Sequence, residues 1–280
     1  MKAALIPPTK ELRYFGNNSF HLLLSHLFQD PKYVQHYMQQ RMRGAYLVLD
    51  NSAHEYSVGQ DAAKLLQQAA GMRCQEMVVP DSLEDAEGTI EKALSAMEVW
   101  YEGDQAERMK ELDPTLMYVP QGNDEKEWAE CLKELIRIHM FTYRKRGARS
   151  NFVIGLSKDY EKWDGGLDNL LTKYLLPIKE DGIKHRIRIH VHLLGWGRDL
   201  WVLQDLAAKH FWIRSTDSAK PFVYALSGID LSQYPVGCKD YPEYPSRPAT
   251  YFEKRLTPAK RRIAYSNLSV FKGLAGDKSA

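Results

Sequence analysis

Short apolar runs alternate with longer segments of helical periodicity, and this alternation restricts the fold more than any other feature of the chain. The helical segments include residues 61–70, 83–98, 125–144, 166–175 and 199–209. The strand candidates span residues 46–50, 76–81, 116–120, 152–156, 187–194 and 211–214, with two weaker ones near 3–6 and 13–16. Alternating strands and helices predict parallel strands joined by helical crossovers.

Eight strand candidates in 280 residues favour a closed barrel over an open doubly wound sheet. An open sheet that binds a dinucleotide carries a glycine-rich turn after an early strand, whereas this chain has only Gly195-Trp196-Gly197, late in the sequence. We therefore predict one α/β domain, a (β/α)8 TIM barrel over residues 1–230. Residues 231–280 are predicted to form a C-terminal loop and a basic helical extension packed on the barrel.

Polar residues follow several of the predicted strands, at the pole where barrel enzymes place their chemistry. Asp50 ends one apolar run, Asp81 and Gln121 follow the next two, and Asp217 comes after the last. One aspartate after a strand is most often a turn or helix-cap residue, but three at one pole predict a site. Carboxylates there can act as nucleophile and general base, and Asp and Gln can bind the edge of a nucleobase.

Six segments carry motif-like residues in a consistent order. They are 18–22 (Asn-Ser-Phe-His-Leu), 50–55 (Asp-Asn-Ser-Ala-His-Glu), 80–82 (Pro-Asp-Ser), 120–122 (Pro-Gln-Gly), 193–197 (Leu-Leu-Gly-Trp-Gly) and 217–221 (Asp-Ser-Ala-Lys-Pro). Together they resemble the motifs N-T-Y-H-L, D-S-G-G-F/Y-Q, F-D-E-C, V-Q-G-G, L-M-G-V-G and F-D-C-x-x-P-T-R of the guanine transglycosylases. These barrel enzymes exchange guanine in nucleic acid for a 7-deazaguanine.

The resemblance implies a role for each matching position. Asp217 would be the nucleophile that attacks the sugar C1′, and Asp50 the general base for the incoming base. The other matching residues would bind the substrate: Asp81 and Gln121 at the purine edge, His54 and Leu194 on the two faces of the base, Gly195 and Gly197 through the backbone, and Asn18 in the first motif.

Departures from the family pattern favour DNA over tRNA as the substrate. The paired glycines of the second motif are Ser52 and Ala53 here, and its glutamine is Glu55. The family's cysteine–histidine zinc cluster is missing, since Cys74, Cys131 and Cys238 are far apart. The zinc-free pattern resembles the DNA-modifying branch found in phages and bacterial modification clusters. It implies a pentosyltransferase that uses a free 7-deazaguanine of the 7-cyano type and no metal or other cofactor.

The C-terminal region adds a candidate nucleic-acid surface. Residues 239–272 contain eight basic and three acidic side chains, and aromatic residues lie between them. Such a stretch can contact backbone phosphates and unstacked bases, although a terminal helix covering the barrel is an equally good interpretation. The candidate contacts are Lys254, Arg255, Lys260, Arg261 and Arg262.

Three other functions stay open. One is a tRNA-guanine transglycosylase. Another is a metal-dependent hydrolase, because His190 and His192 point to the same side of one strand and Asp217 lies on the next. The last is a non-catalytic barrel that binds nucleic acid. For all of them we expect an intracellular protein without a membrane partner, or a phage protein acting in the host cytoplasm, because residues 1–8 do not suit a signal peptide.

Overall fold

The computed structural model describes residues 1–16, 18–56, 59–146, 148–195, 200–235, 238 and 241–277. Eight strands form one parallel sheet in the order β1-β8-β7-β6-β5-β4-β3-β2, and β1 also lies against β2. The strands are β1 Lys2–Leu5, β2 Phe20–Leu24, β3 Tyr46–Asp50, β4 Glu76–Val78, β5 Thr115–Tyr118, β6 Phe152–Ser157, β7 Ile189–Leu194 and β8 Ile213–Ser218. The (β/α)8 barrel predicted from the sequence is therefore confirmed.

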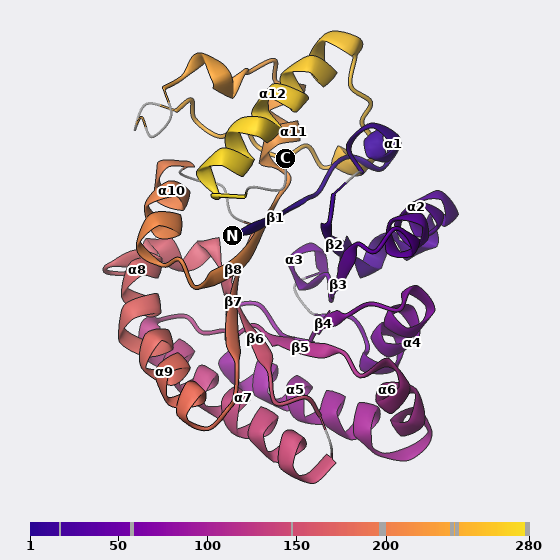
Figure 1. The fold of residues 1–280 in the computed structure, drawn as a ribbon, viewed down its shortest axis with the longest axis vertical. Helices are drawn as coiled ribbons and strands as arrows, with labels where there is room; N and C mark the ends of the chain where they lie inside the picture. Colours follow the sequence, from indigo (N-terminus) through magenta and orange to yellow (C-terminus); the bar gives the residue numbers. More distant parts are fainter. Residues whose placement is uncertain are drawn as a thin grey trace.

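Helices surround the sheet and connect successive strands (Figure 1). They are α1 Leu12–Phe15, α2 Pro31–Met42, α3 Ala53–Tyr56, α4 Ala62–Met72, α5 Ala86–Tyr101, α6 Ala106–Leu112, α7 Glu125–Arg146, α8 Gly166–Leu170, α9 Leu176–Lys184, α10 Leu200–Lys209, α11 Lys220–Leu226 and α12 Pro258–Leu274, with a π-helix at Leu171–Leu175.

Side-chain caps fix where several of these helices begin. Asp30, Asp61, Asp85 and Thr257 each accept a hydrogen bond from a backbone N–H in the first turn of α2, α4, α5 and α12, respectively. A cap of this kind satisfies one of the backbone donors that a helix start leaves unpaired. The sequence therefore specifies these crossovers locally, before any tertiary packing.

Two of the strand predictions need correction. Residues 13–16 are not a strand, because Leu12 and Phe15 lie three apart and bury one side of the short helix α1. The strand in this region is β2, at Phe20–Leu24. The last strand also runs further than its apolar residues suggest, from Ile213 to Ser218, because its polar side chains are buried.

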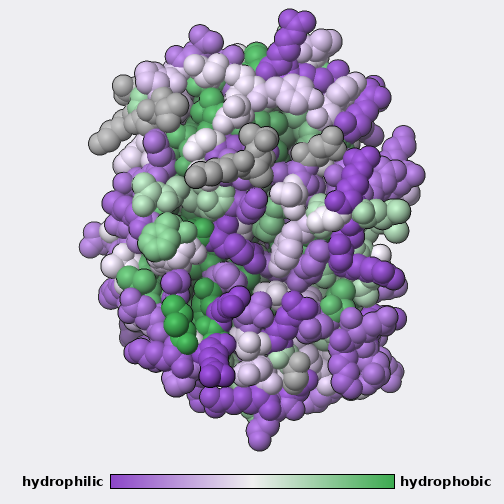
Figure 2. All heavy atoms as spheres, viewed as in Figure 1, coloured by the Kyte–Doolittle hydropathy of each residue, from purple (hydrophilic) through white to green (hydrophobic). Residues whose placement is uncertain are grey.

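Two apolar layers hold the barrel together. The larger one lies between the strands and the surrounding helices. The smaller one fills the barrel interior with residues from six strands and the β5–α7 loop: Ala4, Phe20, Leu22, Leu24, Val48, Val78, Met117, Val119 and Val153. The rim of the face in Figure 2 is mostly hydrophilic, and hydrophobic side chains show mainly toward its middle.

The C-terminal helix α12 closes the outside of the barrel where the chain began. It packs on α11 and α10, and α11 and α12 lie side by side in Figure 1. The N-terminal amine donates to Ala275 O at 3.0 Å, and Ala3 N donates to Asp277 Oδ2 at 2.9 Å. The predicted C-terminal helical extension is thus present, and it ties the two ends of the chain together.

Candidate active site at the mouth of the barrel

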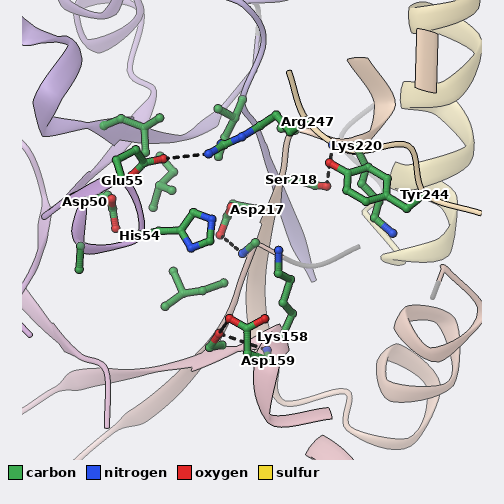
Figure 3. A pocket seen from close by; sticks show the side chains of 18 of the residues that line it. Asp50, His54, Glu55, Lys158, Asp159, Asp217, Ser218, Lys220, Tyr244 and Arg247 are labelled. Atoms are coloured by element: carbon green, nitrogen blue, oxygen red, sulfur yellow. Dashed lines mark hydrogen bonds and ion pairs between the residues drawn. The ribbon is translucent and has the colours of Figure 1, made fainter. Parts of the chain in front are cut away.

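A cavity of about 660 Å³ opens at the carboxyl ends of the strands (Figure 3). Asp50, Asp81, Gln121 and Asp217 all line it, so the sequence predicted correctly that these four side chains share one mouth. A volume of this size suits a ligand as large as a nucleoside. The four residues come from the ends of β3, β4, β5 and β8.

Asp217 lies near the end of β8 and is only 2% exposed. Its Oδ1 lies 3.0 Å from His192 Nε2 and accepts a hydrogen bond of 3.0 Å from Gly195 N. Gly195 has a φ of +59°, a conformation that glycine adopts at little cost, and this turn directs its N–H to the carboxylate. Among the described residues, none donates to Oδ2, which is therefore available to a ligand.

Asp50 ends β3, and its Oδ2 accepts a hydrogen bond of 2.8 Å from Ser52 N. Burial raises the pKa of this carboxyl well above its ordinary value, and the nearby acids Glu55, Asp217 and Asp81 raise it further. A raised pKa favours the protonated form of a carboxyl, which can give its proton away during a reaction. Asp50 and Asp217 thus lie in different hydrogen-bonding environments.

The loop after Asp50 has a strained backbone at Ser52, whose φ is +58°. Its hydroxyl lies 3.0 Å from Ser25 Oγ and 2.9 Å from His26 Nδ1. These contacts hold a conformation that would suit glycine better.

Asp81 and Gln121 form a rigid pair on the wall of the cavity. Asp81 accepts hydrogen bonds of 2.6 Å from Asn51 Nδ2 and from Gln121 Nε2. The amide oxygen of Gln121 accepts from Tyr160 Oη at 2.9 Å and from Glu84 N at 3.2 Å. Burial raises the pKa of Asp81 to about 6, although the two amide donors oppose this. The amide of Gln121 is thus largely occupied within the protein.

Three more of the predicted substrate residues reach the same cavity. His54, Leu194 and Gly195 line it, and Figure 3 shows the His54 ring pointing into its centre. Gly197 lies outside the described residues. Asn18 was predicted wrongly: its amide donates to Ala3 O at 2.7 Å and Phe20 O at 2.9 Å, which bridges β1 and β2 near the starts of the strands rather than at the mouth.

The C-terminal loop covers one side of the mouth, which the sequence did not reveal. Arg247 Nη2 lies 3.4 Å from Glu55 Oε1 and also faces the rings of Tyr251 and Phe252. Tyr244 from the same loop lies over Lys220, with 4.3 Å between the ammonium nitrogen and the ring centroid. Residues far apart in sequence thus complete the wall opposite the predicted acids.

Lysine and arginine side chains also line the cavity, and sequence reasoning missed them. Lys158 follows the last residue of β6, Lys220 follows Asp217 by three residues, and Arg247 lies in the covering loop. Figure 3 shows Lys158 reaching toward the Asp217 side of the cavity. Lys158 and Lys220 could have been found from their positions just after two strands, as the acids and the amide were.

The basic residues of the C-terminal region behave differently from one another. Arg261 donates to the buried Glu11 at 2.6 and 3.1 Å, and Lys260 Nζ donates to Leu226 O at 2.6 Å. These two side chains fasten the extension to the barrel. Tyr251 and Phe271, two of the aromatic residues that lie between these basic side chains, are fully buried and cannot stack on bases. Three of the predicted cations are exposed: Lys254, Arg255 and Arg262.

The two histidines of the predicted metal site have different surroundings. His192 contacts Asp217 and Ser215, whereas His190 lies near Arg214, Glu76 and Arg188 toward the start of the strand. Within the described ranges, no group of three or more His, Cys, Asp or Glu side chains is placed to hold a metal ion. No helix in the described part of the chain has both the length and the apolar character needed to cross a membrane.

Matches to known proteins occur among solved structures alone. No family model matches the chain, and no curated protein matches its sequence. Among solved structures, one match is a protein from Coccidioides immitis assigned as a fructose-1,6-biphosphate aldolase, with a TM-score of 0.48 and 11% identity over 99% of this chain and 87% of that one. This likeness carries no information about the activity of the present chain.

Proposed function

We propose that this protein is a base-exchange glycosyltransferase that replaces guanine in DNA with a 7-deazaguanine of the 7-cyano type. The observation that carries the proposal is the arrangement of Asp217 and Asp50 at one mouth. Asp217 has one oxygen without a donor among the described residues, and burial together with nearby acids raises the pKa of Asp50. The motif resemblance supplies the substrate class, and the cavity is large enough for a nucleoside.

In the first half of the reaction, Oδ2 of Asp217 attacks C1′ of the deoxyribose and forms a C1′–O bond. The C1′–N9 bond to guanine breaks, and its electron pair stays on the departing base. Asp50 gives its proton to a ring nitrogen of that base, which leaves as neutral guanine. An aspartate suits this step because its ester with an anomeric carbon is reversible.

In the second half, the 7-deazaguanine takes the place of guanine. Asp50, now a carboxylate, removes the proton from the ring nitrogen that attacks C1′. The C1′–O bond to Asp217 breaks, and the electron pair returns to the carboxylate. The same side chain thus serves as acid and then as base, which microscopic reversibility requires of a near-symmetric exchange. The raised pKa of Asp50 favours its protonated form at the start of the exchange.

The base would lie between His54 and Leu194, with its edge against Asp81. The carboxylate of Asp81 still has lone pairs beyond those bonded to Asn51 and Gln121, and these can accept N–H groups of a guanine edge. Gln121 would act mainly by fixing Asp81, since Tyr160 and Glu84 already occupy its oxygen. A base can reach this wall only when it is single-stranded or rotated out of the duplex.

The phosphates beside the target nucleotide would contact cations at the mouth. Lys158 and Arg247 line the cavity and are partly exposed, whereas Arg261 and Lys260 are engaged in holding α12 to the barrel. Lysine and arginine supply the sequence-independent part of nucleic-acid affinity by neutralising phosphates. We therefore move the main DNA contact from the C-terminal helix to the mouth, with Lys254, Arg255 and Arg262 as outer contacts.

The test is trapping of the covalent intermediate. Purified protein is incubated with single-stranded DNA, duplex DNA and tRNA, each with and without labelled guanine or 7-cyano-7-deazaguanine, and run on denaturing gels. We expect a protein–DNA adduct and label exchange with DNA, both lost in Asp217→Asn. Asp159→Asn, a change at an exposed acid of the same rim, is the matched control. Normal exchange by Asp217→Asn would refute the proposal, and exchange into tRNA alone would correct the substrate.

A further inference from the structure

Behind Asp217, polar side chains form a continuous hydrogen-bonded chain through the barrel interior. Arg214 donates to Glu76 with two bonds of 2.6 and 2.8 Å, and its Nε lies 3.2 Å from Ser215 Oγ. Ser215 Oγ lies 2.8 Å from His192 Nδ1, and His192 Nε2 lies 3.0 Å from Asp217 Oδ1. The chain therefore runs from the starts of β4 and β8 to the mouth.

One arrangement of donors and acceptors uses every hydrogen of this chain. Arginine has no acceptor, so its Nε donates to Ser215 Oγ. The single hydroxyl hydrogen of Ser215 can then point to His192 Nδ1, its one acceptor among the described residues, and Nδ1 accepts it only when this nitrogen carries no proton. The proton of the neutral ring is therefore on Nε2, where it is donated to Asp217.

The opposite tautomer would break the chain at two points. The lone pair of Nε2 would face a carboxylate oxygen at 3.0 Å, and the hydroxyl hydrogen of Ser215 would have no acceptor among the described residues. His192 and Ser215 are both completely buried, so bulk water does not replace a missing partner. An unmade hydrogen bond in such a place is costly.

We propose that His192 is a positioning residue for Asp217, and that Arg214 and Ser215 hold its ring as the neutral Nε2–H tautomer. This inference rests on the proposed function. A neutral donor orients the carboxylate without cancelling the charge that makes it a nucleophile. Because His192 and Gly195 both bind Oδ1, the oxygen that attacks C1′ is Oδ2.

The same two donors would also help in the second half of the exchange. In the covalent intermediate, Oδ1 is the carbonyl oxygen of the ester. When the C1′–Oδ2 bond breaks, the negative charge returns to the carboxylate, and the N–H groups of His192 and Gly195 stabilise it. Donors fixed in advance at the place where charge develops lower a barrier most effectively.

The first experiment needs no substrate and stands apart from the proposed function. The tautomer of His192 is read by ¹⁵N NMR of histidine-labelled protein, and the signal is assigned by its loss in His192→Phe. We expect the proton on Nε2 in the wild-type protein and a mixture of tautomers in Ser215→Ala. A proton on Nδ1 in the wild-type protein, or an unchanged tautomer in Ser215→Ala, would overturn the proposal.

The second experiment measures the rate of adduct formation in a single turnover. We expect His192→Phe to slow it on the order of 10²-fold, the cost of one fixed donor, with DNA affinity unchanged. His192→Gln should recover part of the rate, because its amide can donate to Asp217. The control is His139→Phe, which changes a buried histidine on the helix α7, away from Asp217. This variant should react at the normal rate.

The outcomes separate the two proposals. If Asp217→Asn still forms product, the proposed function fails whatever the tautomer. If Asp217→Asn is inactive but His192→Phe reacts normally, only the positioning role fails. Should His192→Phe not fold, Ser215→Ala provides the decision, because it leaves the ring in place. A smaller loss of rate with unchanged DNA affinity supports the role, and an unchanged rate refutes it.

Discussion

At the start of the strands, the buried carboxylate of Glu76 receives two hydrogen bonds from Arg214 and one of 2.9 Å from Tyr46 Oη. At the mouth, Asp81 and Asp217 lie close enough to Asp50 to raise its pKa. Among the described residues, no lysine or arginine forms an ion pair with any of these three carboxyl groups. The buried carboxylate at the start of the strands is paired with an arginine, whereas the carboxyl groups at the mouth have no such partner among the described residues. This is the difference expected between a stabilising pole and a reactive one.

The largest effect on stability should therefore come from the compensated pole. Glu76→Ala would leave Arg214 without its partner inside the barrel. We expect a loss of about 3 kcal/mol in the free energy of unfolding, at the low end for a broken buried pair because the Arg214 side chain is 21% exposed. Urea denaturation measures it, with Glu76→Gln as the milder control. A loss no greater than that of a surface change would mean that this pair does not stabilise the barrel.

A substitution at the mouth is expected to change the free energy of unfolding in the opposite direction. Asp50→Asn removes a carboxyl whose ionisation is opposed by burial and by three nearby acids, so we expect a gain of about 2 kcal/mol in stability at pH 7. The native state holds the proton of Asp50 more tightly than the unfolded chain does. The stability of the wild-type protein therefore falls as the pH rises above the ordinary aspartate value, whereas the variant does not share this fall.

Unfolding of both proteins from pH 4 to pH 8 tests this sign. The advantage of Asp50→Asn should be greatest at the alkaline end and smallest at pH 4, close to the ordinary aspartate pKa of about 3.9. A difference that does not vary with pH would show that Asp50 acts through packing and not through its charge. Loss of activity in the variant would accompany its gain in stability.

A smaller effect is expected for Asn18, which we had assigned to the substrate. Asn18→Ala removes two donors that bridge β1 and β2, and we expect a loss of about 1 kcal/mol in stability. Asn18→Asp keeps the acceptor for Ser19 N but not the donors, so it should destabilise at least as much. The apparent KM for DNA should not change in either variant. A raised KM with normal stability would return Asn18 to the site.

The sequence predicted the poles of the barrel better than it predicted the contacts within them. The end of a strand can be predicted because its apolar run stops there. This alone placed Asp50, Asp81, Gln121 and Asp217 at one pole, and they line one cavity. The prediction for Asn18 was wrong because a short motif does not show at which end of the barrel its residues lie. Its segment precedes β2, so its side chain lies where the strands begin.

Contacts between distant segments could not be predicted from the sequence. The link from Arg214 to Asp217 depends on the register of β7 and β8, which is shifted between Val191 and His192. The covering loop reaches Glu55 across 192 positions of sequence through Arg247. Arg261 appeared to be a nucleic-acid contact because charge is visible in a sequence, whereas its buried partner Glu11 is not.

The smallest predicted effect is on DNA binding, and its measurement tests which pole of the barrel contacts DNA. Lys158→Ala should weaken DNA binding less than about tenfold and reduce the slope of affinity against salt by about one unit, as the loss of one phosphate contact does. Lys145 lies at the exposed C-terminal end of α7, which the topology places at the opposite pole, so Lys145→Ala is the matched control. Titrations at several salt concentrations measure both. If the control changes the slope and Lys158→Ala does not, the DNA lies along the basic residues at the start of the strands, and the acids at the mouth serve a smaller ligand.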